Sequence, residues 1–384
     1  MGIFICPRCG NRDERYIGYH NGVPYCRLCI SFQGREASRD HSVSKGISLH
    51  LDYPLSLKQK EVSDKVVDAV SKHKNVFIHA VTGAGKTELV YRSMEYVLKR
   101  GGHVGFATPR KDVVIDLLPR IQKAFPDAEV VSVYGEHTSK IVGDILVLTT
   151  HQLYRYPGYF DLLIVDEIDA FPYRDNDLLH AFFRRSLRGN YILLSATPTK
   201  EDLENVKQDN GIVVTLFERY HHGKLPLPEF VVSTAILMKF RCLLLLQRLV
   251  HQGKPVFVFA PTIEEGESLF RFLNLFVKNG SFVCSKSINR SLDIERFKFG
   301  ELDYLVTTSI LERGVTVRNL QVIVYHSDHS VYQQATLVQI AGRVGRKADA
   351  RDGNVYFIGE EMNQSIQRSI EEIRHYNQEA DHNE

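Results

Sequence analysis

The sequence lacks several features that would place it in a narrower class of protein. No apolar run approaches the ~20 residues that a helix needs to cross a bilayer. The first residues lack the charged and then apolar layout of a secretory signal, so we expect a cytosolic protein. Charge of one sign is not in excess: 48 Lys and Arg against 46 Asp and Glu give +2, which neither requires nor excludes a polyanionic partner.

Cysteine is also scarce, with six in 384 residues. A reducing cytosol argues against disulfides, which leaves metal binding, catalysis or burial. Four cysteines form two C-x₂-C pairs, Cys6 with Cys9 and Cys26 with Cys29, and sixteen residues separate the pairs. This spacing is typical of a closed tetrahedral Zn²⁺ site, and four thiolates leave no position for a catalytic water. We therefore expect a structural zinc finger.

The finger, residues 1–48, has no apolar pattern long enough for a core of its own and needs its metal to fold. It carries seven Arg or Lys against four Asp or Glu, and metal-bound thiolates leave it only faintly basic. Four aromatic side chains could stack on bases or form a small core: Tyr16, Tyr19, Tyr25 and Phe32. Contact of the finger with DNA is therefore left open.

The other cysteines, Cys242 and Cys284, stand alone in apolar stretches and are predicted to be buried thiols. The sixteen histidines, including His221 and His222, show no metal-binding spacing. We expect them at the surface or satisfied within a core.

From Leu51 onward, short apolar runs alternate with segments of helical length. The apolar runs expected to be strands are 76–80, 104–107, 145–148, 162–165 and 191–194, then 256–260, 304–306, 322–325 and 355–358. The segments expected to be helices are 87–100, 112–124, 235–251 and 264–278. Strands that are apolar on both faces and separated by helices predict parallel sheets covered on both sides.

A break rich in proline and glycine at 219–228 divides this pattern in two. The predicted domains are a zinc finger at 1–48, a first ATP-binding lobe at 49–220, a linker at 221–230 and a second lobe at 231–384. The end of the chain, from about Tyr376, is polar and is expected to fray. The predicted fold class is α/β with two RecA-like phosphate-loop lobes and a small zinc module.

The strongest motif is a phosphate-binding loop between an apolar strand and a helix. It runs Ala80-Val81-Thr82-Gly83-Ala84-Gly85-Lys86-Thr87. Its glycines allow main-chain N–H groups to face the phosphates of ATP, Lys86 can reach the β and γ oxygens, and Thr87 can hold Mg²⁺. Ala80 replaces the first glycine of the strict pattern.

A pair of acids follows the strand 162–165 at the edge where open α/β sheets bind ligands. Asp166 is expected to complete the Mg²⁺ shell, and Glu167 to orient and deprotonate the attacking water. The spacing from the phosphate loop predicts that the two motifs follow neighbouring strands.

Two further motifs complete the expected ATPase. Ser195 and Thr197, which follow the strand 191–194, can sense the γ-phosphate and pass on its loss. In the segment 339–346, Gln339 precedes Arg343 and Arg346, which are predicted to lie one helical turn apart and to act as arginine fingers.

In this order, the motifs resemble those of superfamily 2 helicases and translocases over residues 51–360. The resemblance implies that Gln59 reads adenine and that Glu312 and Gly314 couple ATP turnover to movement. It also implies backbone contacts to one nucleic-acid strand, which fix register without reading bases. The positions concerned are Thr108, Arg110, Thr149, Thr150, Thr262 and Thr308. Thr316 departs from the pattern, because many relatives carry an acid there.

The finger ahead of a compact helicase core, with the segments 166–172 and 309–315, resembles the ComFA family of late competence proteins. That resemblance implies an ATPase stimulated by single-stranded DNA at the inner face of the membrane, which helps to pull DNA through the uptake channel. ComFC and DprA are the implied partners, and ATP, Mg²⁺ and structural Zn²⁺ the implied cofactors.

Three alternatives stay open. A PriA-like restart helicase shares the acid-Ala-Phe-Pro segment, but such proteins are longer, have an N-terminal DNA-binding domain and carry their cysteines in the second lobe. A nucleotide-switched scaffold would not need Glu167 and two arginine fingers. An RNA remodeller differs only in its dependence on the 2′-hydroxyl.

Overall fold

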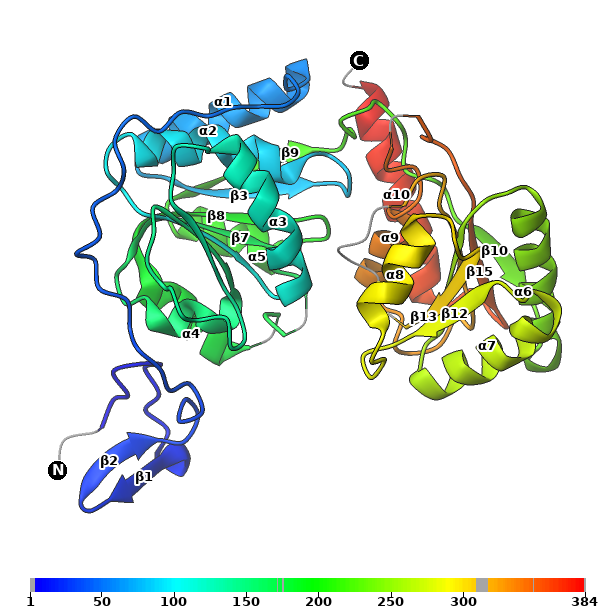
Figure 1. Ribbon diagram of the computed structural model, residues 1–384, viewed down its shortest axis with the longest axis horizontal. Coiled ribbons are helices and arrows are strands. Elements are labelled where there is room, and N and C mark those ends of the chain that lie inside the picture. The colour runs from blue at the N-terminus through cyan, green and yellow to red at the C-terminus, as the bar shows by residue number, and fades with distance from the viewer. Residues whose placement is uncertain (1–3, 171, 175, 309–316, 348, 383–384) are drawn as a thin grey trace. The chain divides into compact units, whose positions relative to one another are not determined.

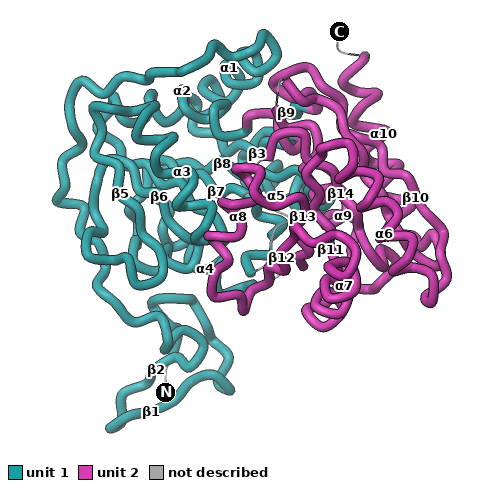
Figure 2. Tube along the Cα trace, turned by 45° about the vertical axis from the view of Figure 1, so that its right-hand side comes forward, with its two compact units in different colours: residues 1–80, 86–216 teal, residues 81–85, 217–384 magenta. Residues whose placement is uncertain are grey.

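The computed structural model describes the chain apart from residues 1–3, 171, 175, 309–316, 348 and 383–384 (Figure 1). The chain divides into two compact units (Figure 2). Residues 1–80 and 86–216 form the first unit, and residues 81–85 and 217–384 form the second. Within the described residues, no helix combines the length and the apolar character that crossing a membrane requires.

The first unit contains a seven-stranded parallel sheet in the order β5-β6-β4-β7-β8-β3-β9. Its strands are β3 (Asn75–Ala80), β4 (Val104–Thr108), β5 (Val130–Val133), β6 (Ile145–Thr149), β7 (Phe160–Asp166), β8 (Leu187–Ser195) and β9 (Gly211–Leu216). Every residue of β4 and β6 is buried, as expected for strands that helices cover on both faces. Figure 1 shows α1 and α2 on one side of this sheet and α4 on the other.

The helices of the first unit are α1 (Leu57–Ser71), α2 (Lys86–Leu98), α3 (Lys111–Ala124), α4 (Asp177–Ser186) and α5 (Lys200–Gln208), with a 3₁₀ segment, η2 (Thr150–Arg155). Local sequence explains where they begin. At α1, the Ser56 hydroxyl accepts a hydrogen bond from the Gln59 N–H, and the Gln59 side chain accepts one from the Ser56 N–H. Val62, Val66 and Val70, spaced four apart, then form its buried face.

The second unit contains a six-stranded parallel sheet in the order β10-β15-β14-β11-β13-β12. Its strands are β10 (Glu229–Val232), β11 (Val256–Phe259), β12 (Gly280–Val283), β13 (Tyr304–Thr307), β14 (Gln321–Val324) and β15 (Val355–Gly359). Its helices are α6 (Ala235–His251), α7 (Ile263–Phe276), α8 (Arg290–Lys298), α9 (Gln334–Ala341) and α10 (Gln364–His382). The two parallel α/β sheets confirm the predicted fold class.

The N-terminal module consists of a 3₁₀ turn, η1 (Glu14–Tyr16), and an antiparallel hairpin of β1 (Ile17–His20) and β2 (Val23–Cys26). Asn21 and Gly22, both with positive φ, form its two-residue turn. The module belongs to the first unit, whose core cluster includes Cys6, Cys26 and Cys29.

The predicted fraying from Tyr376 is wrong, because α10 continues to His382. Tyr376 is buried and stacks on Phe217 with ring centroids 5.0 Å apart. Ile366 and Ile373 are buried on the same helix, seven residues apart. Helix α10 is therefore polar in composition but is held in place by one buried apolar face. The isolated Cys242 and Cys284 are buried, as predicted.

Candidate functional site

The phosphate loop, residues 80–87, begins at the end of β3 and leads into α2. Gly83 and Gly85 have φ angles of 87° and 77°, a left-handed conformation that side chains other than glycine rarely adopt. The Lys86 Nζ donates a hydrogen bond to the Ala80 carbonyl across the loop, at 3.1 Å. A lysine folded over such a loop, at the N-terminus of a helix, is suited to binding a polyphosphate.

The paired acids lie at the same edge of the sheet as the phosphate loop. Asp166 is the last residue of β7 and aligns with Leu194 of β8, and Leu194 also aligns with Ile78 of β3. The expectation that the two motifs follow neighbouring strands is therefore wrong, because β8 lies between them. Glu167 has a φ of 58°, a strained conformation for this residue type. Its N–H donates to the Asp166 Oδ1 at 2.9 Å.

Asp169 connects the acidic motif to the small polar motif at the end of β8. Its two carboxylate oxygens accept hydrogen bonds from the Ser195 hydroxyl at 2.9 Å and the Thr197 hydroxyl at 2.8 Å. All three side chains are buried. A fully hydrogen-bonded buried network is rigid, so a displacement at one motif is passed to the other. The sequence places Asp169 three residues after Asp166 but does not show these two partners.

Gln59, the expected adenine-reading residue, lies in the first turn of α1 and is buried. Its carboxamide oxygen accepts from the Ser56 N–H at 2.9 Å, so the side chain has a fixed orientation.

The segment with the two expected arginine fingers does not continue the helix. Helix α9 ends at Ala341, and Arg343 and Arg346 lie in the turn that follows, so they are not one helical turn apart as predicted. Gly345, with a φ of 69°, shapes this turn. Arg343 is only 1% exposed, and the Arg346 Nε donates to the Gly342 carbonyl at 3.0 Å. Gln339 is buried on α9.

The expected nucleic-acid contacts of the first unit follow the carboxyl ends of two paired strands. Thr108 of β4 aligns with Thr149 of β6, and Thr150 begins η2. The hydroxyls of Thr108 and Thr150 are buried, without a hydrogen-bond partner among the described residues. Contact with a nucleic-acid backbone would therefore depend on the main chain here, or on a shift of the loops. Arg110 precedes α3 and does not cap it with its side chain.

In the second unit, the corresponding positions follow β11 and β13, which pair in register. The Thr262 hydroxyl caps α7 by accepting from the Glu265 N–H at 3.1 Å. Thr308 follows directly after β13. The expected coupling residues Glu312 and Gly314 lie outside the described residues.

The four cysteines of the N-terminal module form a cluster whose sulfur atoms all lie within 4.8 Å of one another. The Sγ atoms of Cys6 and Cys29 are 3.5 Å apart, and those of Cys9 and Cys26 are 3.6 Å apart. Tetrahedral Zn²⁺ with Zn–S bonds of ~2.3 Å requires sulfur separations of about 3.8 Å, so the cluster fits this metal. Burial raises the pKa of the Cys9 thiol to about 11, and a bound cation would favour the thiolate.

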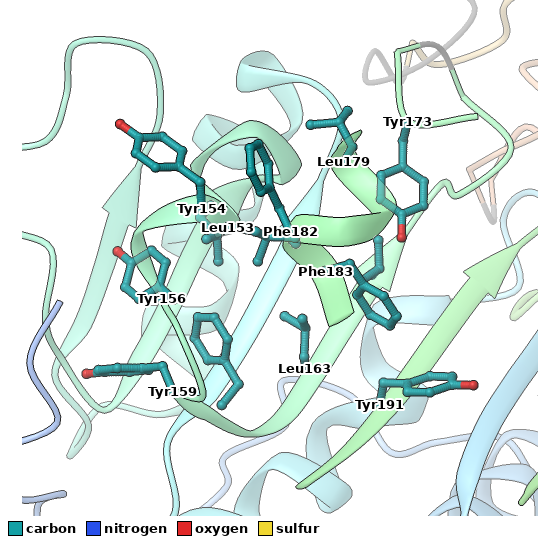
Figure 3. Packing of buried hydrophobic residues seen from close by; sticks show 14 of the residues in the cluster. Leu153, Tyr154, Tyr156, Tyr159, Leu163, Tyr173, Leu179, Phe182, Phe183 and Tyr191 are labelled. Carbon is teal, nitrogen blue, oxygen red and sulfur yellow. The ribbon is translucent and has the colours of Figure 1, made fainter. Parts of the chain in front are cut away.

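The metal module is packed onto η2 and α4 of the same unit. Phe32 lies edge-on to Phe182, with centroids 4.9 Å apart, and stacks on His151 at 6.3 Å. The Arg8 guanidinium donates to the Phe32 carbonyl, which joins the first C-x₂-C turn to this contact. Tyr154 lies beside Phe182 in the core shown in Figure 3. Phe32 thus packs the metal module against the first unit, whereas the sequence left open whether it stacks on bases or forms a small core.

Hydrogen bonds to main-chain carbonyl groups reinforce this docking. The Arg155 side chain donates to the Arg35 carbonyl at 3.0 Å, and the Ala37 N–H donates to the Arg155 carbonyl at 2.8 Å. The Tyr154 hydroxyl donates to the Gln33 carbonyl at 3.2 Å. The chain after the cysteine cluster is therefore tied to the 3₁₀ segment that carries Thr150.

Comparison with known proteins agrees with these motifs. Residues 52–200 match the family "Type III restriction enzyme, res subunit", and residues 238–348 match "Helicase conserved C-terminal domain". Among solved structures, Saccharomyces cerevisiae Dbp5 has a TM-score of 0.63 at 15% identity and covers 84% of this chain and 91% of its own. The helicase MrfA has a TM-score of 0.58 at 15% identity, and the match covers 91% of this chain and 54% of MrfA. The fold is thus that of two RecA-like helicase lobes.

Two curated relatives are similar over nearly the whole chain. The competence protein ComFA of Bacillus subtilis is 34% identical, over 92% of this chain and 81% of the relative. ComFA of Streptococcus pneumoniae is also 34% identical, over 99% and 91%.

The matched domains and the two lobes define an ATP-hydrolysing helicase or translocase of superfamily 2. Within that class, the chain belongs to the ComFA family.

Replacing Lys86 with alanine should lower the ATP turnover rate by roughly 100-fold or more, because the loop loses the charge that stabilises the transferring phosphoryl group. Steady-state turnover checks this expectation. Lys72→Ala is the matched control, since Lys72 is exposed at the C-terminal end of α1 and forms an ion pair with Asp68 of that helix. Wild-type turnover in Lys86→Ala would exclude the loop as the ATP site.

Replacing Cys26 with serine should reduce bound zinc from about one ion per chain to nearly none, because three thiolates hold the ion much more weakly. Elemental analysis of purified protein measures the metal. The control Cys284→Ser changes a buried cysteine outside the cluster and should keep its zinc. A full complement of zinc in Cys26→Ser would show that the ligand set is wrong.

Proposed function

We propose that this chain is an ATPase and translocase, dependent on single-stranded DNA, that helps to drive DNA uptake during natural transformation. The observation that carries the proposal is the similarity to two competence proteins, over 92% and 99% of this chain. The helicase domains support the DNA-dependent motor, and the family name supports the biological setting.

In the proposed reaction, main-chain N–H groups of Thr82, Gly83, Ala84 and Gly85 hold the phosphates of ATP, and Lys86 neutralises their charge. The oxygens of Thr87 and Asp166 are the hard ligands that Mg²⁺ prefers, and their placement at one sheet edge supports a metal there. The ion would offset charge on the β and γ phosphates.

Hydrolysis needs an oriented water and a stabilised leaving phosphate. Glu167 would orient the water and take its proton, while Arg343 and Arg346 would stabilise charge on the transferring group. Ser195 and Thr197 would pass on the loss of the γ-phosphate, which their bonds to Asp169 support. Glu312 and Gly314 would act in the same coupling. Gln59 and Gln339 would bind ATP, with Gln59 at the adenine.

A single DNA strand would bind at the carboxyl ends of the strands of both sheets. The proposed contacts come from Thr108, Arg110, Thr149, Thr150, Thr262 and Thr308. The zinc module would act on this surface through η2, because its residues are tied to the segment that carries Thr150. Zn²⁺ would then stabilise a module that contacts the segment proposed to bind DNA.

The setting proposed for this motor is the cytoplasmic side of the DNA-uptake channel, with the protein peripheral to the membrane. ComFC and DprA are the proposed partners. Co-purification of each with the tagged chain from competent cells would test them.

The first test is ATP turnover with single-stranded DNA, double-stranded DNA and RNA over a series of salt concentrations. Single-stranded DNA should stimulate most, and half-maximal DNA concentration should rise steeply with salt because phosphate contacts release counterions. Equal or stronger stimulation by RNA would favour an RNA remodeller. No stimulation by any nucleic acid would favour a nucleotide switch.

Replacing Glu167 with glutamine should leave ATP binding intact and reduce hydrolysis by roughly 100-fold or more, because the water loses its base. The complex with ATP should accumulate, and ATP should then change DNA affinity more durably than in the wild type. Fluorescence anisotropy of labelled single-stranded DNA, with and without ATP, measures this. An ATP effect on DNA affinity identical to that of the wild type would count against the assigned role.

A further inference from the structure

Arg219 is a buried arginine whose hydrogen-bond acceptors, among the described residues, are main-chain carbonyl groups. Its side chain is 1% exposed. The Nε donates to the Thr82 carbonyl at 3.2 Å, and the Nη2 donates to the Gly342 carbonyl at 3.1 Å. The Nη1 donates to the carbonyls of Val344 and Gly345, both at 2.8 Å. One side chain of the second unit thus joins the phosphate loop to the turn that carries Arg343 and Arg346.

Of the two residues after Arg219, Tyr220 binds both of these segments and His221 binds the turn. The Tyr220 N–H donates to the Gly83 carbonyl at 3.2 Å, and the Tyr220 hydroxyl donates to the Arg346 carbonyl at 3.1 Å. The His221 Nε2 lies 2.7 Å from the Gly345 carbonyl, while its Nδ1 accepts from the Gly223 N–H. Burial lowers the pKa of His221, so the ring is neutral near pH 7 with its proton on Nε2.

Two glycines lie beside the Arg219 side chain. A Cβ at Gly345 would lie 2.1 Å from the Arg351 carbonyl oxygen and 3.0 Å from the Arg219 Nη1, whereas one at Gly83 would lie 3.5 Å from the Arg219 Nε, an ordinary contact distance. Both glycines have positive φ. Glycine therefore permits the backbone conformation of the two segments that Arg219 binds.

The charge of Arg219 has little local compensation. No carboxylate among the described residues forms an ion pair with it, and burial together with the Arg346 charge lowers its pKa to about 9. Its partial compensation comes from carbonyls beyond the C-terminal end of α9, where the helix dipole is negative. A polyphosphate in the adjacent loop would supply the negative charge that the site lacks.

We propose that Arg219 is a positioning residue of the ATPase, which fixes the turn of Arg343 and Arg346 to the phosphate loop. The proposal rests on the proposed roles of that loop and of the two arginines. Nucleotide that orders the loop then also sets the main chain from which both arginines extend. Losing Arg219 leaves the phosphate-binding N–H groups in place and misplaces the arginines.

The test compares Arg219→Gln and Arg219→Lys with the wild type by steady-state kinetics with single-stranded DNA. We expect kcat to fall at least 10-fold in Arg219→Gln, with KM for ATP and the affinity for a non-hydrolysable ATP analogue within about 3-fold of wild type. Arg219→Lys, which keeps the charge but cannot form four directed bonds, should lie between. The control Arg318→Gln removes an exposed arginine of the same unit that is paired with Asp349. It should change neither kcat nor KM for ATP.

A mutant cycle with the variant Arg343→Ala/Arg346→Ala separates this proposal from the arginine assignment on which it rests. If Arg219 acts through the two arginines, adding Arg219→Gln to that variant should not lower kcat further. Additive losses, or a loss in Arg219→Gln that lies wholly in KM, would overturn the positioning role. Unchanged kcat in Arg343→Ala/Arg346→Ala would instead overturn the arginine-finger assignment.

Thermal denaturation of each variant, with and without the ATP analogue, shows whether a loss of kcat is due to unfolding. If Arg219→Gln is unfolded at the assay temperature, Arg219→Lys carries the comparison, because it keeps the buried volume and charge. The proposal would be refuted if folded Arg219→Lys had the wild-type kcat and Arg219→Gln had the wild-type kcat per folded molecule.

Discussion

The burial of both faces of each parallel sheet is the constraint on which the rest of this structure depends. Parallel strands that are covered by helices must all run in one direction, so their carboxyl ends meet at one edge. In the first unit that edge brings together Asp166, Ser195 and the start of the phosphate loop, from strands that are far apart in sequence. The chemistry is assembled by topology, and each strand contributes one or two polar residues where its apolar run stops.

The N-terminal module is held by a different principle. Its hairpin is too small to bury a core, and a cluster of four thiols at metal-binding separations takes the place of one. Phe32 and the main chain around Ala37 then attach the module to η2 and α4. Metal binding is thereby connected with the segment in which nucleic-acid contacts are proposed, and the module is an integral part of the first unit.

The phosphate loop is divided between the two units, since residues 81–85 belong with 217–384 while Lys86 belongs with the first sheet. The bonds of Arg219 explain that division, because they join Thr82 to the turn after α9. Residues 219–221, which read as a linker from their composition, are in fact the most densely bonded part of that segment. The glycine and the prolines on which the linker prediction rests follow them.

The sequence alone determined the class of fold, the phosphate loop, the paired acids and the four-cysteine cluster, because each depends on local spacing: alternating runs, positive-φ glycines and C-x₂-C pairs. Tertiary structure decided what local spacing does not encode. Strand order placed β8 between Asp166 and the phosphate loop, and packing on Phe217 kept α10 helical beyond Tyr376. The roles of Asp169, Phe32 and Arg219 also depend on long-range partners, since carboxylates, rings and guanidinium groups reveal their function only through the atoms that they meet.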